Sequence, residues 1–206
     1  MPFSTTGLNQ MLDALAGGTP TTTIAFASLH TAFSATGLSE VTGGSPAYAR
    51  KAITFAAASG GSKASSTQPV FDVPALTTVA YVGLWQLVSG GTFAGMGANG
   101  GATQFGFTCT LASPGSFTAP SSAYSVNDTV VLFPGAGATL PTGTAAGTVY
   151  YIGTVTGSVF TLSTTLANAN PVNTSTVGAG IVQKITTETF NAQGTFTLSA
   201  DTLTIV

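Results

Sequence analysis

The most unusual property of this sequence is how few ionisable side chains it contains. Only 5% of the 206 residues are charged, against a typical ~25% in globular domains. The exterior must therefore consist mainly of Ser, Thr, Gly, Ala and Asn. Such a surface suits permanent protein contacts, because few charges need to lose their hydration when it is covered. We favour an assembling protein, and the alternative interpretation is a Thr/Ser-coated β protein that stays monomeric.

The sequence lacks a basic stripe. Its four basic residues are Arg50, Lys51, Lys63 and Lys184, and the formal net charge is −2. Nucleic-acid binding through phosphate neutralisation needs clustered basic residues, so we expect no nucleic-acid partner. Arg50 and Lys51 form the only local positive patch. We include both among the candidate interface residues, where they pair with acidic groups across an interface or remain solvated.

Cysteine and long apolar runs are also scarce. Cys109 is the single cysteine, so no intrachain disulfide is possible. It lies in an apolar stretch, which predicts a small buried residue and not a reactive thiol. No stretch approaches the ~20 apolar residues of a membrane helix, and the first residues lack a signal-peptide pattern. We expect synthesis in a host cytoplasm without the usual export signal, and no membrane partner.

One short helix is predicted near the N-terminus. The apolar residues recur with helical spacing and form a single face, and they are Leu8, Met11, Leu12 and Leu15. Ser and Thr at 4–6 offer N-caps, and Gly17 follows as a stop. A helix this short needs packing for stability. Its apolar face either covers the protein's own sheet or docks on another subunit, so these four residues are candidate interface residues.

After Pro20 the pattern predicts an all-β protein. Runs rich in Thr, Val, Ile, Phe and Tyr alternate with Gly, Pro, Ser and Asn. The expected strands lie near 22–30, 50–57, 69–73, 78–88, 92–97, 104–111, 128–133, 148–155, 158–163, 181–186, 194–199 and 202–206. Strands with such turn spacing suggest a β-sandwich or jelly-roll-like domain.

A change in amino-acid composition along the chain predicts two domains. Residues 112–180 are richer in Pro, with Gly/Ala turns and a strand set of their own. We interpret this segment as a small β module inserted late in the first domain. Residues 181–206 are again similar in composition to residues 1–111. The first domain is then discontinuous, formed by residues 1–111 and 181–206.

Motifs for catalysis are weak throughout. His30 is the only histidine, and no nucleophile-elbow Gly-x-Ser-x-Gly occurs, so a structural role is favoured over a Ser-His-Asp site. The six carboxylates are dispersed and give no glycosidase pair. Residues 95–100 match Gly-x-Gly-x-x-Gly but lack the helix of a dinucleotide site, which favours a bulge or tight turn. For Trp85, a position in the core is favoured over a role as a platform on which a sugar ring stacks. We expect no cofactor, no metal and no catalytic residues.

Several segments resemble a family of small tailed-phage tail-fibre-like proteins. Residues 40–61 resemble a stretch common in that family, which often has an Ala-Arg-x-Ala-Val-Thr-Phe core followed by a Gly-Gly turn. Val79–Trp85 resembles its next strand, and residues 89–93 its Ser-Gly-Gly-Thr-Phe turn. Glu188–Phe190 and Gly194–Leu198 resemble its closing segment. The family runs straight from its Gly-rich strand into these closing strands, whereas this chain carries the second module between them.

The second module resembles a short β repeat of phage tail proteins. Residues 140–151 carry the resemblance, with Asp128–Phe133 before them and Phe160–Ser163 after. These resemblances imply a non-enzymatic virion structural protein, a tail-fibre-like or minor tail component located on the tail or capsid surface. Its expected partners are copies of itself and other virion proteins. Two alternatives stay open: a capsid decoration or cement protein, and a carbohydrate-binding or glycan-degrading tail module that recognises a host-surface glycan.

Overall fold

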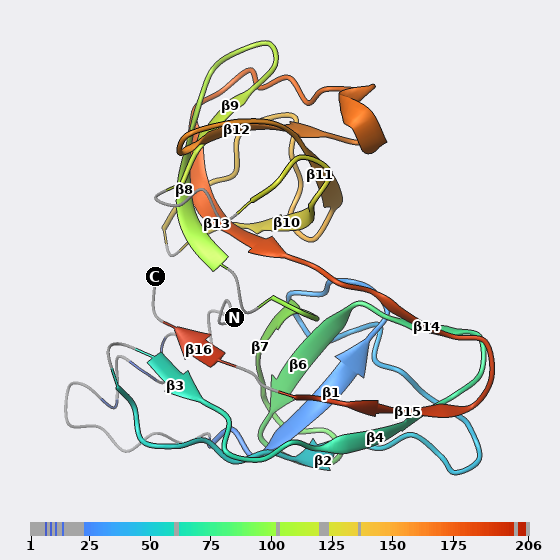
Figure 1. The fold of residues 1–206 in the computed structure, drawn as a ribbon. Helices are drawn as coiled ribbons and strands as arrows, with labels where there is room; N and C mark the ends of the chain where they lie inside the picture. The colour runs from blue at the N-terminus through green and yellow to red at the C-terminus, as the bar shows by residue number, and fades with distance from the viewer. Residues whose placement is uncertain are drawn as a thin grey trace. The chain divides into compact units, whose positions relative to one another are not determined.

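The computed structural model describes residues 23–59, 62–101, 104–119, 124–135, 137–199 and 202–204, together with four single positions near the N-terminus. The chain forms β-strands with almost no helix (Figure 1). It divides into two compact units. Unit 1 contains residues 1–99 and 187–205, and unit 2 contains residues 100–186. Each unit is described by itself.

Unit 1 is built around a four-stranded antiparallel sheet. The strand order is β2 (Lys51–Ala52), β1 (Phe26–His30), β6 (Tyr81–Trp85) and β7 (Phe93–Ala98). Because side chains alternate along a strand, β1 places Ala27 and Leu29 on one face and Ser28 and His30 on the other. All four of these residues are buried, so the sheet is covered on both faces, as the apolar character of both faces of residues 79–87 predicts.

A long antiparallel ribbon accompanies this sheet. Its first strand is interrupted and consists of β3 (Ser62–Ala64), β4 (Val70–Val73) and β5 (Thr77–Val79). The C-terminal β16 (Thr202–Thr204), β15 (Gly194–Thr197) and β14 (Glu188–Phe190) pair with these in turn. The register shifts by only one residue between the pair Val79–Glu188 and the pair Ser62–Thr204. Residues 188–204 therefore pair along residues 62–79, which precede the barrel in the sequence.

The ribbon and the sheet share one apolar core. Ala27 and Leu29 of β1 lie in the same buried cluster as Phe71 of β4 and Phe196 of β15. Phe71 packs with its ring centroid 6.4 Å from that of Phe196 and 6.2 Å from that of Tyr48. Burial of apolar area is the main stabilising contribution to such a unit. Its core depends on residues at both ends of the sequence.

Unit 2 is a closed six-stranded antiparallel barrel. Around the barrel the order is β10 (Thr129–Phe133), β11 (Val149–Thr156), β12 (Val159–Ser163), β9 (Ser116–Thr118), β8 (Gln104–Thr110) and β13 (Gly178–Lys184). A single 3-10 turn, η1 (Leu166–Asn168), follows β12. A bulge between Ile152 and Val155 bends β11, as strands of a small barrel require.

Aromatic side chains fill the barrel. Phe117 is fully buried, and its ring centroid lies 5.6 Å from those of both Phe107 and Phe160. Tyr124 joins this cluster and donates its hydroxyl hydrogen to the Val182 carbonyl oxygen at 3.1 Å. The described side chains therefore fill the interior with a packed apolar core.

The all-β prediction is confirmed, while other details differ from the sequence analysis. β3, β9 and β14 were missed, and the strand expected over 78–88 divides after Val79 and ends at Trp85, leaving Leu87 exposed. β8 and the start of β13 belong to the barrel, so unit 2 is longer than the expected 112–180 module. The sandwich or jelly-roll topology and the domain assignment stay predictions. Within the described part of the chain, no helix has the length and apolarity to span a membrane.

Candidate functional site

A buried polar network lies on the second face of the unit 1 sheet. Ser28 Oγ is 2.7 Å from His30 Nε2, and the Trp85 indole N–H donates to Ser28 Oγ at 2.9 Å. His30 Nδ1 lies 2.9 Å from the carbonyl oxygen of Leu38. A carbonyl only accepts, so Nδ1 carries the hydrogen, and Nε2 of the neutral ring accepts from Ser28. The network links the sheet to the loop after β1.

The local sequence explains why this network fits. Ser28 is paired with Gly83 across the two strands. A Cβ at Gly83 would come within 2.6 Å of both His30 Nε2 and Ser28 Oγ, so only glycine leaves room for the pair. Gly37 likewise allows its loop to approach the Trp85 ring, and its φ of +81° favours glycine. Two glycines thus make space for the polar groups beneath the loop.

Burial governs the protonation of this cluster. Ser28 and His30 are fully buried, and the loss of hydration lowers the pKa of His30, opposed by its hydrogen bond to Leu38 and by Glu40. Desolvation also raises the pKa of Tyr81 to about 12. A Ser-His pair is the geometry of a nucleophile and its base. This pair is enclosed, however, and its atoms are engaged with Trp85 and Leu38, which is typical of a structural role.

Arg50 anchors the neighbouring loops. Its guanidinium binds the Glu40 carboxylate, with Nη2 at 2.7 Å from Oε2 and Nε at 2.9 Å from Oε1. Nη1 donates to the carbonyl oxygens of Leu87 and Gly90 at 3.1 and 2.8 Å. The guanidinium carbon also lies 3.5 Å from the centre of the Trp85 ring, a cation–π contact. Its side chain is only 9% exposed, so Arg50 holds three segments of unit 1 together.

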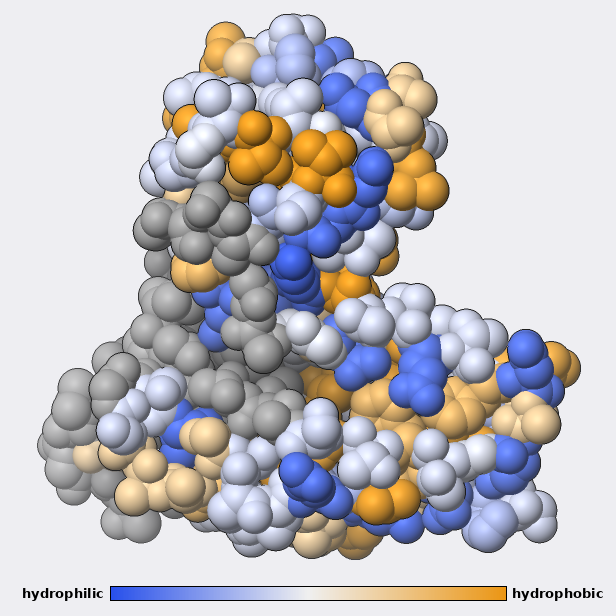
Figure 2. Space-filling model, in the orientation of Figure 1, coloured by the Kyte–Doolittle hydropathy of each residue, from blue (hydrophilic) through white to orange (hydrophobic). Residues whose placement is uncertain are grey.

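Two further ion pairs use most of the remaining basic groups. Lys51 Nζ lies 3.4 Å from Asp72 Oδ2, and Lys184 Nζ lies 2.7 Å from Asp128 Oδ2. Three of the four basic side chains are therefore neutralised within the chain. The visible face of each unit contains many pale residues of intermediate hydropathy, with strongly hydrophilic and strongly apolar ones among them (Figure 2).

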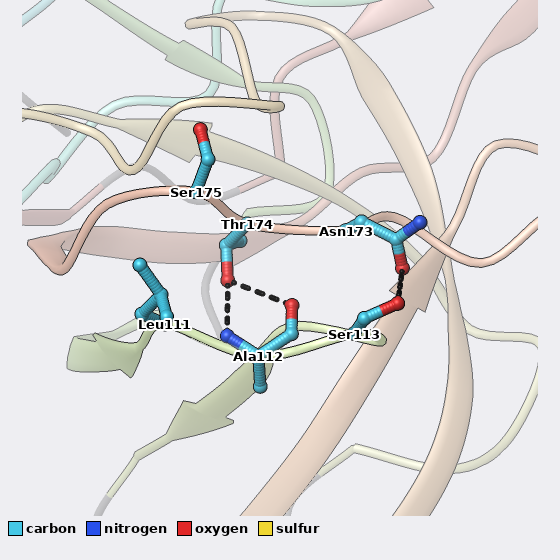
Figure 3. Close-up of a pocket in the computed structure, with 6 residues that line it drawn as sticks. All are labelled: Leu111, Ala112, Ser113, Asn173, Thr174 and Ser175. Carbon is cyan, nitrogen blue, oxygen red and sulfur yellow. Dashed lines mark hydrogen bonds between the residues drawn. The ribbon is translucent and has the colours of Figure 1, made fainter.

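The barrel carries an open groove of about 390 Å³ between two loops. It is lined by Leu111, Ala112, Ser113, Asn173, Thr174 and Ser175. Thr174 holds the loops together by accepting from the Ala112 N–H at 3.3 Å, and Ser113 donates to Asn173 Oδ1 at 2.9 Å (Figure 3). Leu111 is 63% exposed beside it. This groove is open and lined by uncharged residues, and Ser113, Asn173 and Thr174 form hydrogen bonds across it.

A second open groove on the barrel, of about 530 Å³, lies along β8 and the end of β9. Hydroxyl-bearing residues Thr108, Thr118 and Ser158 line it. No charged residue lines either groove. Neutral hydroxyls and methyl groups are suited to contacts with another neutral surface, and they offer no group for acid–base chemistry near neutral pH.

The expected site residues lie in different places. Leu8, Leu12 and Leu15 fall outside the described residues, and Met11 is half-buried. The helix and its interface role stay predictions, as does the interface role of Arg50 and Lys51, whose ion pairs within unit 1 the sequence did not indicate. Cys109 is buried as predicted, and burial raises its pKa.

Carboxylates and metal ligands are dispersed. Glu40, Asp72 and Asp128 each bind a different basic side chain. No group of three or more His, Cys, Asp or Glu that could hold a metal ion occurs among the residues that the structure covers. The segment 95–100 forms the end of β7 and its turn, with Gly100 at φ +72°. It is therefore a strand and a tight turn, as the sequence predicts.

Comparison with known proteins identifies the family of the chain. Residues 2–104, half of the sequence, match the family described as Podophage GP4 fiber I protein gp80. Neither a curated protein nor a solved structure matches the chain significantly. The match covers β1 to β7 of unit 1, which contains the Arg50 and His30 network. The chain belongs to the Podophage GP4 fiber I protein gp80 family, and it is a virion-associated protein of the bacteriophage tail-fibre type.

Proposed function

We propose that this chain is a non-enzymatic structural component of the tail fibre of a tailed phage, and that it acts by assembling with copies of itself and with other virion proteins. The observation that carries the proposal is the neutral exterior. Arg50, Lys51 and Lys184 are all engaged in ion pairs within the chain. Among the described residues outside these pairs, Lys63 and Glu188 are the exposed charged side chains, and hydroxyl, amide, methyl and backbone groups form most of the remaining surface. Covering such a surface costs little desolvation of charge, which favours permanent association.

The arrangement of the polar groups supports a role without catalysis. The only histidine is fully buried and holds a loop through Leu38. The Glu40 carboxylate is bound by Arg50 in a bidentate pair. A general base must reach the proton that it removes, and neither group faces one of the two grooves. Both groups stabilise unit 1 instead.

The barrel acts, in this proposal, as an exposed module that the tail-fibre unit presents outward. The family match ends at residue 104, where β8 of the barrel begins. The chain leaves unit 1 after β7 and returns to it with β14. Both ends of the barrel segment are thereby tied to one scaffold, which is the arrangement expected of an inserted interaction module.

The test is to locate the chain in the intact particle. An antibody against the barrel is added to purified virions, and the label is imaged by electron microscopy. We expect labelling of the tail and, on quantitative gels, roughly tens of copies for each particle, as cyclic tail symmetry implies. Hundreds of copies on the head would favour the capsid decoration alternative, and absence from the particle would overturn the proposal.

A second measurement addresses the glycan alternative. Purified protein is applied to an array of bacterial surface glycans, alone and after the substitution Thr118→Arg, which blocks the larger groove. No binding by either protein is expected from the proposed structural role. Binding that T118R abolishes, or release of sugar fragments, would support a carbohydrate-recognition module instead.

A further inference from the structure

The C-terminal strand of unit 1 is paired on one side only. β14 pairs with β5, and β15 pairs with β4. Over the part of the chain that the structure describes, no strand pairs with the opposite edge of β14 or β15. Most of residues 188–199 are exposed. A strand in this position presents a row of backbone donors and acceptors to whatever approaches it.

The register identifies which groups point outward. The Leu198 N–H donates to the Pro69 carbonyl oxygen at 3.0 Å. In an antiparallel pair, alternate residues bond to the neighbouring strand, so Gly194, Phe196 and Leu198 direct their backbone groups toward β4. Thr195 and Thr197 therefore direct their N–H and C=O groups to the open edge. These two residues provide a matched set of two donors and two acceptors.

The edge lacks the features by which proteins usually block such pairing. β15 pairs without a register shift, so no bulge distorts it, and its sequence Gly-Thr-Phe-Thr contains neither proline nor charge. Phe196 turns into the core and is 4% exposed, while Thr195 and Thr197 are exposed. The strand is thus firmly held on one side and open on the other.

We propose that this edge pairs antiparallel with the same edge of a second copy of the chain, about a two-fold axis at Phe196. Thr195 then exchanges hydrogen bonds with Thr197 of the partner subunit, and Thr197 with Thr195 of the partner subunit. This inference rests on the assembling role proposed above and names the surface that carries it. A two-fold contact of this kind closes after two subunits, because each edge is used once.

Charge and side-chain chemistry favour a second copy as the occupant. Glu188 would face Thr204 of the partner subunit, and Asp72, which lies opposite Thr195 within the chain, would be separated from Asp72 of the partner subunit by both copies of β15, so the pairing opposes no like charges. The two threonines of each strand would face each other across the axis. Cross-strand threonine pairs already occur within this chain, with Oγ1 atoms 3.0 Å apart in Thr78–Thr189 and 2.9 Å apart in Thr154–Thr161.

The experiment is sedimentation equilibrium of the full chain and three double variants. T195K/T197K places lysine opposite lysine twice, and we expect the dimer dissociation constant to rise ~10-fold or more. T195K/T197E places lysine opposite glutamate at both positions, and we expect dimerisation to be retained. A146K/T148K adds the same charge at two exposed barrel positions, and it should leave the dissociation constant unchanged.

Hydrogen exchange gives an independent measurement. The amides of Thr195 and Thr197 should become protected as protein concentration rises, and T195K/T197K should remove the concentration dependence. A monomeric wild-type chain, or equal weakening by both edge variants, would overturn the pairing. If antibody labelling finds the chain in the tail while these results fail, the tail-fibre role stands and only this surface is wrong.

Discussion

The two units differ in how they treat the edges of their sheets. Every strand of the barrel has two neighbours, since β10 pairs with β11 and β13 and the circuit closes through β12, β9 and β8. In unit 1 the described part of the C-terminal ribbon has a neighbour on one side only. Closure removes edges altogether. The comparison teaches that backbone-mediated assembly is available to unit 1 and not to the barrel.

The units also differ in what they bury. The barrel packs Phe107, Phe117 and Phe160 against one another. Unit 1 adds to its apolar core a cluster of hydrogen-bonded polar groups around His30 and Trp85. Buried polar networks stabilise only when each member has its partner. We therefore expect unit 1 to respond to pH and to small steric changes, and the barrel to respond mainly to the loss of apolar volume.

The largest expected effect is in the barrel core. Phe117→Ala removes a fully buried ring and should lower the free energy of unfolding of the barrel by about 3–5 kcal/mol. Urea unfolding is followed by circular dichroism and by fluorescence of Trp85, the only tryptophan, which lies in unit 1. The Trp85 transition should stay in place. An equal shift of both signals would mean that the two units unfold together.

The next effect tests steric fit around the polar network. Gly83→Ala introduces a Cβ beside His30 and Ser28 and should destabilise unit 1 by about 1–3 kcal/mol, measured from the Trp85 transition. Gly106→Ala in the barrel is the matched control. The atom nearest to a Cβ added at Gly106 is the Gly180 carbonyl oxygen, at 4.0 Å. We therefore expect Gly106→Ala to leave the stability of the barrel unchanged. Equal destabilisation by both would contradict the role of the network.

A smaller effect separates two adjacent basic residues. Arg50→Lys loses the bidentate contact with Glu40 and the flat stacking on Trp85, and it should cost about 1–2 kcal/mol of unit 1 stability. Lys51→Arg keeps a single, partly exposed pair with Asp72 and should change stability by less than ~0.5 kcal/mol. Both values come from urea unfolding. If the two substitutions had the same effect, the anchoring role of Arg50 would be wrong.

The smallest effect is a dependence on pH. The pKa of His30 is lowered by burial in the folded chain, so below its ordinary value of about 6.5 the unfolded chain binds a proton that the folded chain does not. The stability contributed by neutral His30 is therefore fully present above that pH and falls as the pH drops below it. His30→Gln should flatten this dependence. The control Asp72→Asn, which removes a carboxylate paired with Lys51 outside the His30 network, should retain it.

Much of the strand pattern was predictable from residue alternation. The segments Val130 to Phe133, Phe160 to Ser163 and Tyr81 to Trp85 are dense in β-forming residues, and all fall within strands. β9 and β14 are only three residues long, too short for a period of two to be recognised. The barrel itself could not be predicted, because alternation indicates which face a side chain takes and not which strand lies beside it.

The candidate site was less predictable than the fold. Arg50 and Glu40 are separated by a loop with Gly43 and Gly44 at positive φ, and no local spacing rule relates two residues across such a loop. The burial of His30 depends on Gly37 and Gly83 leaving space, which only the folded arrangement reveals. By contrast, the burial of Cys109 and Trp85 followed from apolar neighbours and was predicted correctly.

The order of the strands also sets an order for synthesis. β3, β4 and β5 leave the ribosome before the barrel strands, whereas their partners β14, β15 and β16 leave after them. The barrel strands all emerge in between, so the barrel can fold while unit 1 still waits for its closing strand. A chain truncated by premature termination would thus lack the ribbon that completes unit 1. Assembly would then be restricted to chains translated beyond β16.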